Sequence, residues 1–132
     1  MILLSEFYST IPPKSTFQQR NKNFNLTPQA RLTKATYRAI LEKFRPPAPF
    51  DGPLHFRLVL TWPHTRQSRK AAEGHTAIAK TTRPDGVNIL KMVEDIMTDL
   101  AFWHDDNQLS IETVERYYGD FPGILLQIES IE

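Results

Sequence analysis

The chain has 132 residues and a net charge of +1, with 40% hydrophobic and 23% charged residues, which is typical of one folded domain with a hydrophobic core. It contains no cysteine, which excludes disulfide bonds and thiolate metal sites. No apolar stretch approaches the roughly 20 residues that a membrane-spanning helix needs, so we expect a single domain over residues 1–132 with no membrane segment.

The first predicted elements are a strand and a helix. The apolar start of the chain has no basic residue before it and predicts a strand over residues 2–10 rather than a signal peptide. Thr27 and Pro28 are residue types favoured at a helix N-cap and first turn, and the helix that they begin extends to about Phe44. Apolar residues at helical spacing predict its buried stripe: Leu32, Ala35, Ala39, Ile40 and Phe44.

The rest of the chain predicts four strands, a basic loop and a second long helix. Residues 54–62 alternate apolar and polar side chains, as in a half-buried strand, and residues 63–76 predict a basic loop with at most a helical turn. A short strand over 77–82 and an amphipathic helix over 87–100 follow. Residues 109–117 and 124–131 predict two strands joined by a turn into a terminal β-hairpin. This order predicts the α+β class, with a mixed β-sheet and two main helices on one face.

Charge is strongly segregated along the sequence. Residues 1–91 contain 15 of the 16 basic residues and five of the 15 acidic residues, whereas residues 92–132 contain one basic residue, Arg116. Such segregation indicates either a basic surface for an anionic partner beside an acidic region, or a solvated surface on which folding mixes the charges. The sequence alone leaves both interpretations open.

Acidic residues flank the second long helix. Asp85 precedes it, and Asp105 and Asp106 follow it. A compact fold can bring acids from both ends of a helix to one metal ion, which suits phosphodiester hydrolysis because a divalent cation activates water. Structural interpretations exist as well: Asp85 is a common N-cap residue, and Asp105 and Asp106 suit a solvated turn. Neighbours in a strand point to opposite faces, so the last two acids can share a direction only if the backbone turns there.

The stretch that contains these acids carries a longer pattern. Its members are Pro84, Asp85, Asn88, Lys91, Asp95, Trp103, Asp105, Asp106 and Gln108. This pattern resembles the core of the RusA family of Holliday junction resolvases, which reads proline-Asp-x-Asp-Asn-x-x-Lys, then a helix with an Asp, an aromatic residue and Asp-Asp-x-Gln. A second patch, residues 11–15 ahead of the first helix, resembles the start of the family. Val87 departs from the pattern, because the family usually has its second Asp there.

The resemblance implies a RusA-like fold and a function. It implies an Mg²⁺-dependent endonuclease that resolves four-way junctions or other branched DNA in recombination and repair, acting as a homodimer in the cytoplasm and encoded by a bacterium or phage. Asp85 and Asp106 are implied as metal ligands, with Asp105 as a further candidate, and Lys91 as the cation at the scissile phosphate. Asn88 and Asp95 are implied as supporting residues, although a capping amide and an ion-pair partner of Lys91 are the alternatives.

Eight basic residues are candidates for contacts with DNA phosphates, provided that they converge near the acids. Each is also, taken singly, a common solvated surface charge. The set is Lys14, Arg20, Lys22, Arg66, Arg69, Lys70, Lys80 and Arg83.

Val87 leaves a second function open. A two-metal mechanism needs several carboxylates, and valine offers no ligand atom. The alternative to a resolvase that works with the remaining acids is a homologue that has lost a metal ligand and binds branched DNA without cutting it.

Overall fold

The computed structural model describes residues 1–13, 27–82 and 85–131. Their elements, in chain order, are β1 (Ile2–Tyr8), α1 (Pro28–Glu42), β2 (Leu54–Pro63), α2 (Arg66–Ala71), β3 (Ala77–Ala79), α3 (Gly86–Asp99), the short 3₁₀ helix η1 (Asp106–Gln108), β4 (Leu109–Gly119) and β5 (Gly123–Ser130). The helical turn allowed within the basic loop is present as α2, and the strand expected over 77–82 is present as the shorter β3. None of the helices in these ranges has the length and apolar character to cross a membrane.

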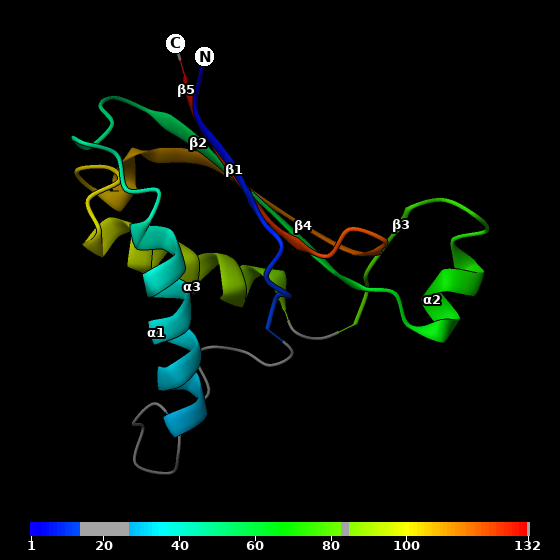
Figure 1. The fold of residues 1–132 in the computed structure, drawn as a ribbon. Helices are drawn as coiled ribbons and strands as arrows, with labels where there is room; N and C mark the ends of the chain where they lie inside the picture. The colour runs from blue at the N-terminus through cyan, green and yellow to red at the C-terminus, as the bar shows by residue number, and fades with distance from the viewer. Residues whose placement is uncertain (14–26, 83–84, 132) are drawn as a thin grey trace.

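The five strands form one mixed sheet in the order β1-β5-β2-β4-β3. The central strand β2 pairs in parallel with β4 and antiparallel with β5. β1 pairs with β5, so the two ends of the chain lie side by side (Figure 1). The parallel pair of β2 and β4 is joined by a crossover that contains α3 on one face of the sheet.

The predicted terminal hairpin is wrong in its pairing. Both strands exist, but β2 lies between β4 and β5, so the two are not neighbours in the sheet. The central place suits β2 because its side chains alternate between fully buried and half-buried along the whole strand. The connection from Gly119 to Gly123 is long enough, since four residue steps reach about 13–14 Å and two strand spacings measure about 10 Å.

The two main helices cover one face of the sheet, as predicted (Figure 1). Leu54, Phe56, Leu58 and Leu60 of β2 point toward them and are fully buried. They form one hydrophobic core with buried residues of both helices. Burial of a side chain of this size contributes about 1.5–3 kcal/mol to folding, so this layer fixes α3 against the sheet.

The apolar face of α3 is confirmed. Leu90, Val93, Met97 and Leu100, with the flanking isoleucines, are all buried. After the helix, Ala101 adopts a left-handed conformation (φ 59°), and the chain turns back so that Phe102 and Trp103 enter the core. This reversal places the acids that follow it next to the helix rather than beyond its end.

The predicted stripe of α1 is wrong for its first three residues, whereas Phe44 packs against the core as predicted. Leu32, Ala35 and Ala39 are exposed, whereas Tyr37 and Leu41 are buried in the core. The reason is Tyr37, a large ring whose hydroxyl donates a hydrogen bond to the carbonyl of Ile11 (3.1 Å) and thereby sets the rotation of the helix.

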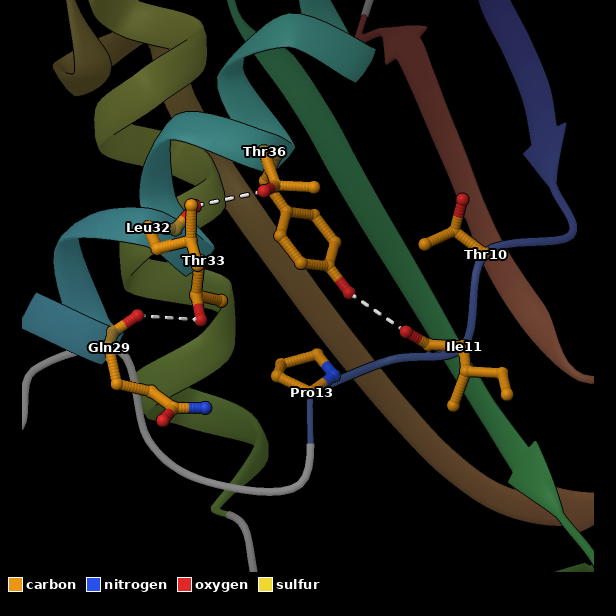
Figure 2. A pocket seen from close by; sticks show the side chains of 8 residues that line it. Thr10, Ile11, Pro13, Gln29, Leu32, Thr33 and Thr36 are labelled. Atoms are coloured by element: carbon orange, nitrogen blue, oxygen red, sulfur yellow. Dashed lines mark hydrogen bonds between the residues drawn. The ribbon is translucent and has the colours of Figure 1, made fainter.

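A pocket of about 340 Å³ lies between α1 and the segment that follows β1 (Figure 2). Thr10, Ile11 and Pro13 line one side, and residues of α1 line the other. Leu32, which is 69% exposed, lies at this pocket. None of the residues implied by the RusA resemblance as metal ligands, catalytic or supporting residues lines this pocket.

Candidate active site

Two of the acids, Asp85 and Asp105, are helix N-caps. Asp85 is the N-cap of α3, and its Oδ1 accepts a hydrogen bond from the backbone N–H of Val87 (2.9 Å). Asp105 caps η1 in the same way by accepting from the N–H of Asn107 (2.9 Å). A carboxylate has two oxygens, so a cap of this kind does not exclude a second ligand role for either residue.

Asp105 and Asp106 share one side of the chain because the backbone turns between them. Asp105 is extended, and η1 begins at Asp106. The hydrogen bond from Asn107, and after it a side-chain hydrogen bond with Asp106, lower the pKa of Asp105. The backbone thus turns between the two acids, as is required for adjacent side chains to point in the same direction.

Gln108 holds the loop that carries these two acids. Its side-chain oxygen accepts hydrogen bonds from the backbone N–H groups of His104 (2.7 Å) and Asp105 (3.0 Å). Its amide nitrogen donates to the carbonyls of Phe50 (3.0 Å) and Gly52 (2.9 Å). Glutamine suits the position because it offers an acceptor and two donors at once. The glutamine of the Asp-Asp-x-Gln pattern thus anchors the acidic loop to the segment that precedes β2.

Lys91 lies one turn of α3 before Asp95 and forms an ion pair with it (3.3 Å). Both side chains are about half exposed, so the pair contributes only about 0.3–0.5 kcal/mol to stability. The hydrogen bond with Asp95 raises the pKa of Lys91 most, and the charges of Asp95, Glu94 and Asp106 raise it further. The effect of Asp106 shows that the acidic loop lies within electrostatic range of Lys91. Asn88, which the resemblance implies as a supporting residue, lies half-buried one turn earlier on α3.

A carboxyl pair that the sequence analysis missed lies beside Lys91 and Asp106. Glu94 of α3 is 6% exposed, and its side chain is hydrogen bonded to that of Glu112. Glu112 is paired with Phe56 in the register of β4 and β2, so it lies on the sheet face that α3 covers. Burial, then the charge and hydrogen bond of Glu112, raise the pKa of Glu94 to about 7, and Asp106 adds to the shift. A hydrogen bond between two carboxyl groups requires one proton, which the pair holds below about this pH.

We expect Glu94→Gln to stabilise the protein at alkaline pH and to have little effect near pH 4.5. The pKa of Glu94 is raised in the folded state, so the stability that its proton provides is complete below the unfolded value of 4.5 and is lost as the pH rises through about 7. The variant keeps a neutral donor, and its free energy of unfolding should exceed that of the wild type by about 1–3 kcal/mol at pH 8. Urea denaturation at pH 4.5, 6 and 8 measures this, with exposed Glu73→Gln as the control. A difference that does not change with pH contradicts the assignment.

A cleft of about 300 Å³ opens beside Asp85, and its lining residues are Thr81, Thr82, Asp85 and Arg116. Arg116 comes from β4, and its Nη1 donates a hydrogen bond to the carbonyl of Thr82 (2.7 Å). Gly86 makes this approach possible, because a Cβ there would lie 2.9 Å from Cδ of Arg116. Asp85, the N-cap of α3, and Arg116, the one basic residue among residues 92–132, therefore line the same cleft.

The predicted DNA-contacting residues fall into three groups. Lys14, Arg20, Lys22 and Arg83 lie outside the described residues. Arg66, Arg69 and Lys70 are exposed on α2, where Arg69 is paired with Asp120 (3.2 Å). Lys80 is 7% exposed, and its amine donates to the hydroxyls of Thr82 and Tyr118 and lies 5.1 Å from the ring centre of Trp62. The described residues of the set thus lie around α2 and the segment that leads to Asp85.

The acids do not form a closed metal cage. Within residues 1–13, 27–82 and 85–131, no three His, Asp or Glu side chains are grouped closely enough to hold an ion. Val87, where the family pattern has a further acid, is 62% exposed and has no ligand atom. Mg²⁺ is commonly bound by one or two carboxylates together with substrate phosphates and water, so a closed cage of protein ligands is not a requirement for this ion.

Comparison with known proteins gives one family. The model of the family described as endodeoxyribonuclease RusA matches residues 10–129, which include both the pattern from Pro84 to Gln108 and the patch at residues 11–15. No individual curated protein matches the chain significantly.

Proposed function

Since the chain belongs to the RusA family of endodeoxyribonucleases, whose members resolve Holliday junctions, we propose that it hydrolyses phosphodiester bonds in four-way junctions or other branched DNA with the help of Mg²⁺. The proposed biological role is recombination and repair of DNA, in the cytoplasm of a bacterial cell and from a bacterial or phage gene. The match to the family model over most of the chain is the observation that carries this proposal.

The proposed roles are those that the RusA resemblance implies for residues on α3 and at its two ends. Asp85 and Asp106, with Asp105 beside the latter, would hold the ion, which supplies activation of water and neutralises charge on the phosphate. Lys91 would contact the scissile phosphate and stabilise the charge that develops there. The position of Lys91 supports this role, because its amine lies within electrostatic range of Asp106, whose charge helps to raise its pKa. Asn88 and Asp95 would orient the groups around Lys91.

We also propose that the protein acts as a homodimer. A twofold dimer presents two identical sites, and a four-way junction is nearly twofold symmetric, so one dimer can cut two equivalent strands. Paired nicks at symmetric positions are the product that this arrangement gives.

A second candidate function is favoured by Val87. Its exposed side chain supplies no ligand, and no three-residue cage is present among the described residues. A homologue with this site would bind branched DNA through its basic residues without cutting it.

The test is a cleavage assay on a four-way junction that is end-labelled on each strand, with an equal-length duplex as the control. We expect paired nicks near the crossover in Mg²⁺, none after addition of EDTA, and none in the duplex. Tight binding to the junction without nicks in Mg²⁺ or Mn²⁺ would replace the resolvase with the binding homologue. Equal affinity for junction and duplex would overturn both.

A further inference from the structure

Arg116 is a cation at the candidate site that neither the RusA pattern nor the proposed mechanism uses. It is paired with Leu60 in the register of β4 and β2, so its side chain lies on the sheet face that the helices cover. Its side chain lies against Gly86 at the start of α3, and its guanidinium reaches the carbonyl of Thr82. We propose that Arg116 binds a backbone phosphate of the DNA strand and positions that strand beside Asp85. This inference rests on the proposed binding of branched DNA.

Arg116 of β4 binds the segment from Lys80 to Thr82 through two groups, its backbone carbonyl and its guanidinium. The backbone N–H of Lys80 donates to the carbonyl of Arg116 (2.9 Å), and the guanidinium of Arg116 donates to Thr82 two residues further on. These bonds hold the cation at a fixed place next to the N-cap of α3. A guanidinium held in this way is preorganised for a phosphate, whose oxygens match its planar fork of donors.

Thr82 also contacts a second cation, Lys80. The hydroxyl of Thr82 is hydrogen bonded to Tyr118 (2.8 Å) and to the amine of Lys80, which also donates to Tyr118 (2.9 Å). Lys80 lies 4.5 Å from the ring centre of Tyr118, and its partners in this network are hydroxyls rather than a carboxylate. Two cations therefore contact Thr82, Lys80 at its hydroxyl and Arg116 at its carbonyl.

Two clefts share lining residues at this point, and together they define a track along the surface. The cleft of Asp85 and Arg116 shares Thr81 and Thr82 with a second cleft of about 260 Å³. The second cleft is lined on its other side by α2, the helix that carries Arg66, Arg69 and Lys70. A single DNA strand that follows the track from α2 would pass Arg116 immediately before it reaches Asp85. Phosphate contacts of this kind fix the register of a nucleic acid on a protein.

The test distinguishes two roles of Arg116: binding a DNA phosphate, or only holding Thr82 in place through its hydrogen bond. Arg116→Met keeps most of the aliphatic part of the side chain against Gly86 and removes the positive charge. Arg116→Lys keeps the charge but lacks the planar guanidinium. Junction affinity is measured from 50 to 300 mM NaCl, alongside urea denaturation. The control is Arg38→Met, which removes an exposed arginine on α1 that is paired with Asp99.

We expect Arg116→Met to weaken junction binding about tenfold at low salt and to reduce the slope of log K against log salt by about one, with Arg38→Met unchanged. Arg116→Lys should restore the slope. Lower stability with unchanged affinity and slope would overturn the proposal and leave Arg116 a structural clamp. These measurements need no cleavage, so they decide the role of Arg116 even if the protein binds junctions without cutting. A wild type that does not prefer junctions over duplex overturns this inference together with the proposed function.

Discussion

Asp106→Asn is expected to abolish cleavage of a four-way junction while junction affinity stays within about threefold of the wild type. Asparagine keeps the shape of the side chain and one oxygen, but it removes the negative charge that a hard divalent cation requires. Loss of a group that acts only during the reaction lowers the rate and leaves binding of the DNA unchanged, so we expect a rate at least about 10³-fold lower. Single-turnover cleavage in Mg²⁺ and gel-shift titration in EDTA measure the two effects separately.

The matched control is Asp99→Asn, which removes a carboxylate at the far end of α3, where it is paired with Arg38. It should cleave like the wild type. Because Asp106 raises the pKa of both Lys91 and Glu94, the Asn variant should also lower both pKa values, which NMR titration can follow. Equal loss of binding and cleavage in Asp106→Asn would show that this residue shapes the loop rather than the reaction.

The fold could be predicted where apolar residues recur in the sequence at one clear spacing, that of a helix or that of a strand. In α3 every apolar residue of the predicted face is buried, and β2 alternates along its whole length. The first three residues of the α1 stripe were predicted wrongly because counting aliphatic residues missed Tyr37, whose large ring is buried and whose hydroxyl donates to Ile11. The hairpin failed for a different reason: turn residues indicate where a chain reverses, but not whether a third strand enters between the two arms.

The candidate site was predictable as far as the RusA pattern extends. The RusA resemblance implied Asp85 and Asp106 as metal ligands, and the structural alternatives that spacing alone favours, a cap and a turn, are both present. Glu94 could have been found, since it follows Leu90 by four residues and precedes Met97 by three, which places a carboxyl group on the buried face of α3. Arg116 could not, because its approach to Gly86 depends on β4 lying next to β2.

Val87→Asp is expected to increase junction cleavage at limiting Mg²⁺ by at least about tenfold and to lower the Mg²⁺ concentration needed for half-maximal rate. The change puts a carboxylate two residues after Asp85, where the family pattern has one. Val87 is 62% exposed, so no core packing is lost, and a negative charge in the first turn of a helix is favourable by about 0.3–1 kcal/mol. The folded protein should therefore tolerate the substitution, and cleavage rates over a Mg²⁺ titration report the site itself.

Two controls separate the added ligand from other effects of this change. Val87→Asn has nearly the same shape as the Asp variant without its charge, and Leu32→Asp adds the same charge at an exposed position of α1. Neither should increase cleavage. A wild type that cuts slowly and a faster Asp variant indicate a working resolvase limited by its metal site, whereas a silent wild type that gains cleavage indicates a binding homologue one carboxylate short of catalysis. If Val87→Asp is no faster than Val87→Asn, the missing carboxylate is not what limits the reaction, and the explanation must lie with the remaining acids or with Arg116 beside Asp85.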